Sequence, residues 1–371
     1  MVLLNDFVRQ WSDIRPDATS AVEEVGASGY YILGPAVAAF EEQLARACGV
    51  RHAVGVGNGL DAIAIALRAA GCQPGQRVLT TPLSAFATSL AVLHVGATPC
   101  FVDVDQHGLL DLDRVEEALA RTPGIAFLLP VHLYGRAVPL RRLQSLTQRF
   151  GVTVIEDGAQ AIGARDGELA VGAAGVATAL SFYPTKNLGC LGDGGALLTN
   201  DAGLAERARA LRNYGQSSRY VHDHLGWNSR LDELHARILA QALLPRLPGW
   251  TERRVAVARA YGGRITNPAL ALPETSQAGP VWHLFPVLLR EGRRDEFQAH
   301  LQAQGVQSGV HYPRLISEQR ALLDGGRFEI LGPLAQARAF ADREVSLPIH
   351  PYLDDSEIDA VVAACNSWRP A

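Results

Sequence analysis

Short strands alternate with helices through the first half of the sequence, and this alternation restricts the possible folds more than any other feature. The side-chain patterns predict, in order, strand 52–56, helix 60–70, strand 77–81, helix 84–95, strand 98–104, a helix that begins near Asp111, and strand 125–131. At such short spacing, strands connected through helices run parallel, and the helices cover both faces of the sheet. We therefore expect an α/β fold with a large, mainly parallel sheet.

The rest of the chain predicts a smaller α+β unit. A helical stretch covers residues 232–260, and beyond it we expect strand 282–289, helix 295–304, strand 306–311 and helix 355–368. A length of 371 residues suits one large and one small domain, which we place at residues 1–245 and 246–371. No low-complexity linker separates the two parts, so we expect them to pack together.

Composition and charge exclude several classes of protein. With 48% hydrophobic and 19% charged residues, the chain resembles an ordinary soluble globular protein. A formal net charge of -4 argues against nucleic-acid binding, which requires an excess of Lys and Arg. No apolar run has the length of a signal peptide or a membrane span, so we expect a cytoplasmic protein. The five cysteines are scattered without a C-x-x-C pair, which argues against disulfides and against a metal site.

One lysine lies between two short apolar runs. The sequence ALSFYPTKNLGCLGDGGALLT, residues 179–199, places Lys186 between apolar residues and glycines, with Asp193 as the nearest carboxylate in sequence. Because burial of an unpaired ammonium lowers its pKa, these flanks favour a lysine that acts as a neutral amine, as Schiff-base formation requires. The alternative is a surface turn whose lysine extends into solvent.

A second stretch supports the catalytic interpretation. The apolar run that begins at Val152 ends in Asp157, at the point where a strand of an α/β sheet opens its ligand crevice. An aspartate there and a loop lysine are the pair that a pyridoxal phosphate (PLP) site requires, since the lysine binds the aldehyde and the acid faces the pyridinium nitrogen. Gln160 follows three residues later and can face the same ligand.

A glycine turn predicts the phosphate site. Gly57-Asn58-Gly59 lies between a predicted strand and a predicted helix, and the free N–H groups of a helix N-terminus bind anions. We expect the backbone of Gly59 and Leu60 to hold the cofactor phosphate, although such a turn alone is usually only a turn.

Five blocks of sequence together resemble the DegT/StrS family of PLP-dependent nucleotide-sugar aminotransferases. They are GNGLDA, PVHLYG, VIEDGAQAIGA, SFYPTKNLGCLGDGGALLTND and RNYG…GWNSRLDELHA, in the order of the family and over nearly the whole chain. The resemblance implies PLP fold type I, like aspartate aminotransferase, in a homodimer with shared active sites. It also implies a cofactor that alternates between PLP and pyridoxamine phosphate, L-glutamate as donor, and a nucleotide-linked keto-6-deoxyhexose as acceptor. The blocks look most like the branch that acts at C3 of dTDP-3-keto sugars.

The resemblance assigns roles to further residues. Phe86 matches the aromatic ring that stacks on the cofactor, and Ser181 belongs to the cofactor-binding block. Asn228 matches the asparagine that crosses the dimer interface to the cofactor phosphate of the partner. Tyr183 and the His311-Tyr312 segment match the substrate side.

Residues 28–33 match an arm near the active site of the family, and packing in the core explains their apolar and aromatic character equally well.

The sequence departs from the family at three places. Leu60 replaces a common threonine, Gly158 replaces a common alanine, and residues 314–317 replace a proline-rich run that contains a histidine. We expect the change at Gly158 to leave the chemistry intact, whereas the last departure affects the substrate side.

Three alternatives remain open. They are amination at C4, a PLP-dependent sugar dehydratase, and a PLP-binding regulator without turnover. Dehydratases of this scaffold carry histidine at the lysine position, so Lys186 argues against that alternative.

Overall fold

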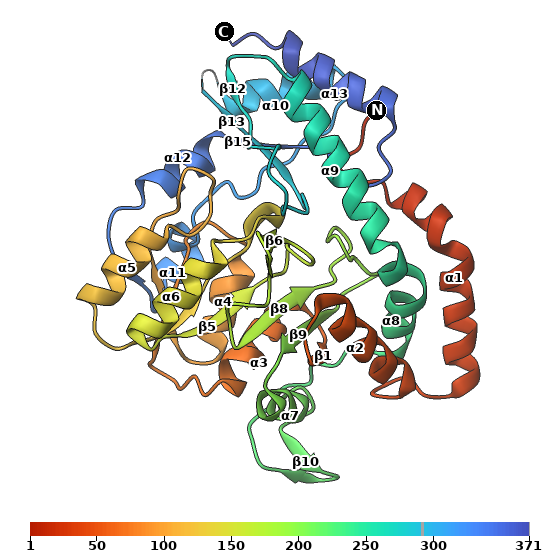
Figure 1. Cartoon of the computed structure of the whole chain (residues 1–371), viewed down its shortest axis with the longest axis vertical. Coiled ribbons are helices and arrows are strands. Elements are labelled where there is room, and N and C mark those ends of the chain that lie inside the picture. The colour runs from red at the N-terminus through yellow and green to blue at the C-terminus, as the bar shows by residue number, and fades with distance from the viewer. Residues whose placement is uncertain (291–292, 371) are drawn as a thin grey trace.

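The protein is built around an eight-stranded sheet, as seen in a computed structural model that describes residues 1–290 and 293–370 (Figure 1). Across the sheet, the strands are β1 (His52–Val56), β9 (Gly195–Thr199), β8 (Ala177–Ser181), β5 (Thr153–Asp157), β4 (Ile125–Leu129), β2 (Arg77–Thr80), β3 (Thr98–Phe101) and β14 (Glu329–Ile330). The strands from β8 to β14 are parallel, whereas β9 pairs antiparallel with both β1 and β8. The expected mainly parallel α/β sheet is confirmed.

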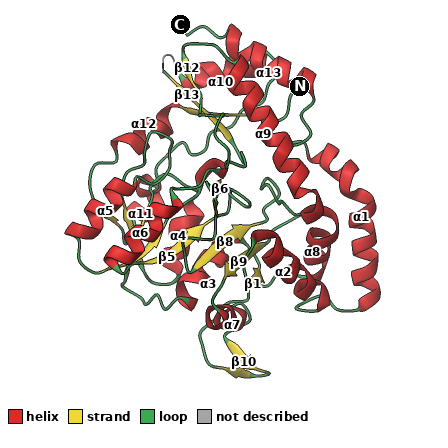
Figure 2. Cartoon of the chain, viewed as in Figure 1, coloured by secondary structure: helices red, strands yellow, loops and turns green. Residues whose placement is uncertain are grey.

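Helices surround this sheet (Figure 2). Those of the first part of the chain are α1 (Phe7–Ser28), α2 (Pro35–Cys48), α3 (Gly59–Ala69), α4 (Phe86–His94), α5 (Leu112–Arg121), α6 (Leu140–Phe150) and α7 (Ala202–Leu211). Local signals set several of the helix starts. Asn58, Asp111 and Asp201 accept hydrogen bonds from the first-turn N–H groups of α3, α5 and α7.

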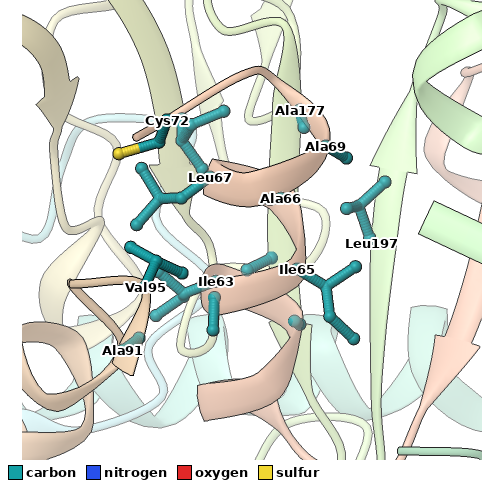
Figure 3. Close-up of a cluster of buried hydrophobic side chains, with 14 of the residues drawn as sticks. Ile63, Ile65, Ala66, Leu67, Ala69, Cys72, Ala91, Val95, Ala177 and Leu197 are labelled. Atoms are coloured by element: carbon teal, nitrogen blue, oxygen red, sulfur yellow. The ribbon is translucent and has the colours of Figure 1, made fainter. Parts of the chain in front are cut away.

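The central helix α3 is apolar nearly all round because it packs between other elements. In Figure 3, Ile65 points toward Leu197 of β9, while Ile63 lies beside Ala91 and Val95 at the end of α4. This burial fixes the direction of α3, and its N-terminus therefore lies at the edge where β8 ends.

A second sheet forms the upper part of Figure 1, near both chain termini. It contains β12 (Leu270–Ala271), β13 (Phe285–Leu289) and β15 (Glu344–Leu347), all antiparallel, with α10 (Arg294–Ala303) and α13 (Asp355–Ser367) beside it. The helix α8 (Glu233–Ile238), a π-helical turn, a 3-10 turn and α9 (Leu247–Arg264) connect the two sheets. The helical stretch predicted for 232–260 is confirmed.

The prediction of a strand at residues 306–311 was wrong. Only isolated bridges occur there, from Val306 to Val2 and from Gly309 to Ser346. The backbone N–H of His311 donates to the carboxylate of Glu344 at 2.6 Å, so it is not available to a ladder partner, and the chain turns toward Gln160 instead.

Between β13 and β15, the chain returns to the first sheet. β14 pairs parallel with β3, and Ile316 and Leu322 of the preceding segment pack on Phe101. Short helices α11 (Arg320–Leu323) and α12 (Ala335–Arg343) belong to the same return. The division at residues 1–245 and 246–371 stays a prediction.

Two further observations concern the composition. In the described ranges, no helix is long and apolar enough to cross a bilayer. All five cysteines are free: Cys48, Cys72, Cys100, Cys190 and Cys365.

Candidate active site

Lys186 lies in a cavity of about 300 Å³ between the two sheets. The lining combines residues from distant parts of the chain: Leu4, Asn5, Gln160, Tyr183, Thr185, Lys186, His283, Leu284, His311, Tyr312, Leu347 and Ile349. Five of the predicted site residues therefore meet at one place, namely Gln160, Tyr183, Lys186, His311 and Tyr312.

The loop that carries Lys186 is closed on itself. β8 ends at Ser181, and the N–H groups of Phe182 and Cys190 donate to Gly194 and Phe182, both at 2.7 Å. Gly189 has no room for a side chain, since a Cβ there would lie 2.2 Å from the carbonyl oxygen of Pro184. This closed loop holds the lysine at a fixed position above the end of the sheet.

The pKa of the Lys186 amine suits proton transfer near neutral pH. Burial lowers the pKa of Lys186 to about 8, and the negative charge of Asp157 opposes the shift. A substantial fraction of the amine is therefore neutral at physiological pH.

Asp157 is a buried carboxylate at the end of β5. One oxygen accepts a hydrogen bond from the hydroxyl of Thr88 at 2.8 Å, and the other accepts from the N–H of Ala159 at 3.1 Å. Burial raises its pKa, and no described side chain forms an ion pair with it. Among the described residues, the carboxylate of Asp157 has no positively charged partner. A protonated pyridine nitrogen would be such a partner, so the residues present fit PLP.

Gln160 joins three segments of the chain. Its carbonyl accepts from the N–H of Tyr134 at 2.7 Å, and its amide donates to the hydroxyl of Tyr312 at 3.1 Å. The hydroxyl of Tyr134 in turn donates to the carbonyl of His311. The substrate-side segment is therefore fixed to the cofactor side through one amide.

His311 is held in its neutral form. Its Nδ1 lies 2.9 Å from the hydroxyl of Ser346. Burial, together with the positive charge of Lys186, lowers its pKa to about 4. The imidazole consequently offers hydrogen bonds without charge.

Several residues of this cavity are not predicted from the sequence. His283 lies just before β13, within the segment 282–289 that was predicted as a strand, and its Nδ1 is 3.2 Å from the amide oxygen of Asn187. Leu4 and Asn5 come from the N-terminus, where the bridge between Val2 and Val306 pairs the chain with the segment after α10. No local pattern signals these positions. One signal was overlooked in the sequence itself: Lys186 is the only lysine of the chain.

The predicted phosphate site lies beside the lysine loop. Gly59 begins α3, and a Cβ there would lie 2.7 Å from that of Ser181. Gly195 approaches as closely, because a Cβ there would lie 2.5 Å from the carbonyl of Asn58. These close approaches bring the free end of α3 to Ser181, while the side chain of Leu60 packs on the core.

The other six predicted site residues do not line the cavity: Gly59, Leu60, Phe86, Asp157, Ser181 and Asn228. Phe86 begins α4 and packs, partly buried, on the cluster of Phe101, Ile316 and Leu322. Asn228 is exposed in the loop after α7. Of the arm at 28–33, Tyr30 and Tyr31 are 63% and 60% exposed, so the alternative that core packing explains them is wrong.

Known structures share this fold. The chain superposes on the crystal structure of DesV from S. venezuelae with a TM-score of 0.93 and 42% identity, over 99% of this chain and 98% of that one. For ntda from Bacillus subtilis with bound cofactor PMP, the TM-score is 0.88 at 30% identity, over 95% and 81% of the two chains. Fold and site together define a PLP-dependent aminotransferase of fold type I.

Sequence comparison gives the family. Residues 12–366 match the DegT/DnrJ/EryC1/StrS aminotransferase family, and the chain belongs to it. The chain is 42% identical, over 98% of its length and 95% of the relative, to the dTDP-3-amino-3,4,6-trideoxy-alpha-D-glucose transaminase of Streptomyces venezuelae. It is 39% identical, over 94% of both chains, to the dTDP-3-amino-3,6-dideoxy-alpha-D-galactopyranose transaminase of Aneurinibacillus thermoaerophilus.

Proposed function

We propose that this enzyme transfers the amino group of L-glutamate to C3 of a dTDP-linked 3-keto-6-deoxyhexose. The observation that supports the proposal most directly is the sugar carbon in the names of its relatives, which is C3. Transaminases of dTDP-3-amino sugars are 42% and 39% identical to this chain over nearly its whole length. A relative that is 37% identical is also named for position 3, on a UDP-linked sugar.

In this proposal, Lys186 moves the proton. Bound PLP supplies an electron sink that stabilises negative charge at the α-carbon of the donor. The amine of Lys186, with its pKa near 8, accepts the proton from that carbon and returns a proton in the second half of the reaction. A pKa close to the working pH allows both directions of transfer.

Other residues hold and orient. Asp157 pairs with the pyridine nitrogen, Gln160 lies on the ring-hydroxyl side, and Phe86 stacks on the ring. Gly59 and Leu60 bind the phosphate through the free end of α3, which favours an anion, and Ser181 of β8 contacts the cofactor beside it.

The substrate side is formed by Tyr183, His311 and Tyr312. Two observations support this assignment. All three residues line the cavity of Lys186, and Tyr183 is 53% exposed, so a ligand can reach it.

We further propose a homodimer in which Asn228 reaches the cofactor phosphate of the partner. The exposed Asn228 and the exposed aromatic arm Tyr30-Tyr31 support this arrangement, because large apolar side chains on a surface commonly mark an interface.

The experiment follows each half of the reaction. Purified holoenzyme is treated with L-glutamate, and the absorption band of bound PLP should change to that of pyridoxamine phosphate. The product formed with dTDP-3-keto and dTDP-4-keto sugars is then identified by NMR. Turnover of the 4-keto sugar alone would establish C4 amination and refute the C3 assignment.

Two relatives bear regulatory names, "Erythromycin biosynthesis sensory transduction protein EryC1" and "Pleiotropic regulatory protein". A missing spectral change with glutamate would favour a regulator of that kind over a transaminase.

A further inference from the structure

A second cavity, of about 440 Å³, shares no lining residue with the cavity of Lys186. It lies where the loop after β3 and the turn after Tyr134 meet β12, β13 and α12. Its polar side chains are Arg136, Glu274, His107, Gln106 and Thr275, and its apolar wall includes Phe340 and Leu272.

Arg136 is the unusual group in this cavity. It is only 9% exposed, and its guanidinium forms no hydrogen bond and no ion pair with any residue at 1–290 or 293–370. Burial lowers its pKa, so the fold disfavours its charge in the absence of a partner. Buried arginines are normally paired, and this one faces an open space instead.

The neighbouring carboxylates are already engaged. Asp105 accepts from the N–H groups of His107 and Leu109 at 2.8 and 3.0 Å, and Glu274 accepts from the N–H of Ser276 at 2.8 Å. Both raise the pKa of Arg136 from a distance, but neither reaches the 4.0 Å of an ion pair. Arg136 therefore retains its capacity to bind an external anion.

The surroundings define the chemistry of that anion. The planar guanidinium matches a carboxylate with two parallel hydrogen bonds. The pKa of His107 is lowered by burial and by Arg136, so its ring adds a hydrogen-bonding group without a second positive charge. With Asp105 and Glu274 nearby, a single negative charge is favoured over a phosphate dianion.

The apolar wall defines the rest of the ligand. Phe340 and Leu272 offer a surface on which a flat or aliphatic body can be removed from water, as in most small-molecule sites. Gln106 and Thr275 add neutral hydrogen-bonding groups.

We propose that this cavity is a second ligand site, which binds a small organic monocarboxylate with its carboxylate on Arg136 and its apolar body against Phe340 and Leu272. The site is independent of the transamination proposed above, because it contains none of the residues assigned to that reaction.

The test uses 4-fluorobenzoate as the probe and the PLP-loaded holoenzyme. Titration followed by ¹⁹F NMR should show saturable binding to one site per chain. Arg136→Gln should weaken this binding at least about tenfold, the loss expected for a charge-assisted bidentate contact. Arg141→Gln is the matched control, because Arg141 is an exposed arginine on the nearby helix α6, and its binding should equal that of the wild type.

Two comparisons locate the probe. The uncharged analogue 4-fluorobenzamide should bind at least about tenfold more weakly, because it lacks the charge that Arg136 requires. Excess dTDP should not displace 4-fluorobenzoate.

The thermal midpoint provides a second readout that does not depend on the probe. Arg136→Gln removes a buried charge that has no ion pair within residues 1–290 and 293–370, so the ligand-free variant should melt at the same temperature as the wild type or higher. The proposal is overturned by absent saturable binding in the wild type, by equal binding in Arg136→Gln, or by displacement of the probe with dTDP. A lower thermal midpoint of the ligand-free variant would also overturn it, because Arg136 would then be a structural residue.

Discussion

Replacement of Asp157 by asparagine is expected to remove catalysis without damage to the fold. The asparagine side chain would keep the size of the aspartate. Its amide oxygen can accept from the N–H of Ala159, and its NH2 group can donate to the hydroxyl of Thr88, which can in turn donate to Ser84. The asparagine would lack the negative charge that stabilises a protonated pyridine nitrogen. Loss of one partner from a buried charge pair costs about 3–5 kcal/mol. At about 1.4 kcal/mol for each factor of ten, turnover should fall by about two to four orders of magnitude.

The same substitution should not lower the thermal stability of the cofactor-free protein, although it lowers turnover. Burial raises the pKa of Asp157, so the folded state binds its proton more tightly than the unfolded state does. Above the raised pKa, the charged carboxylate destabilises the fold, and this cost persists at neutral pH. The neutral amide of Asp157→Asn removes the cost, so the cofactor-free variant should melt at the same temperature as the wild type or higher.

The assay measures turnover with glutamate and the keto sugar, together with the thermal midpoint of the cofactor-free protein. The matched control is Asp193→Asn, because Asp193 is the carboxylate nearest to Lys186 in sequence, yet it is exposed and acts on the charge of His235. This control should retain the activity of the wild type. If Asp157→Asn kept near-normal turnover, the pairing with the cofactor nitrogen would be refuted.

Four further predictions concern the same site. Lys186→Ala should abolish transamination, and borohydride should then fix no PLP to the chain, because the sequence contains no other lysine; labelled peptide after reduction would contradict the assignment. The initial rate at which PLP attaches to cofactor-free protein should rise with pH and level off above about 8, since the neutral amine reacts and burial lowers its pKa from 10.5; a rate still rising at pH 10 would show an ordinary lysine. A mixed dimer of Lys186→Ala and Asn228→Ala chains should recover up to half of the wild-type activity, since one of its two sites is intact; absence of recovery in verified mixed dimers would place Asn228 in its own subunit's site. Gly158→Ala should destabilise the fold by about 1–3 kcal/mol through overpacking, because its Cβ would lie 2.9 Å from the methyl of Thr178, and Thr178→Ser should relieve the cost; equal denaturation midpoints for the single variant and the wild type would disprove the clash.

Much of the large sheet could be predicted from the sequence because its signals are local. The buried strands are short apolar runs, and side chains such as Asn58 and Asp111 cap the helices that follow. The predictions of strands failed where the hydrogen-bond partners are distant in sequence. The segment at 306–311 has the pattern of a strand, but the carboxylate of Glu344 takes the N–H of His311. The two-residue β14 is too short to be recognised, and it exists only because β3 lies beside it.

The sequence by itself determined the two groups that define the chemistry. Lys186 and Asp157 lie within recognisable local motifs, and the family resemblance requires no knowledge of distances. The tertiary structure decided what those groups can do. Burial sets the pKa of Lys186 near 8 and that of His311 near 4, and burial depends on residues as distant in sequence as Leu4 and Ile349. It also placed Arg136 in a second cavity, without an ion pair to any residue that the structure describes, and no sequence pattern around Arg136 predicts this. The physical reason is that helix caps and apolar runs act between neighbours, whereas desolvation and charge act through space between segments that only the fold brings together.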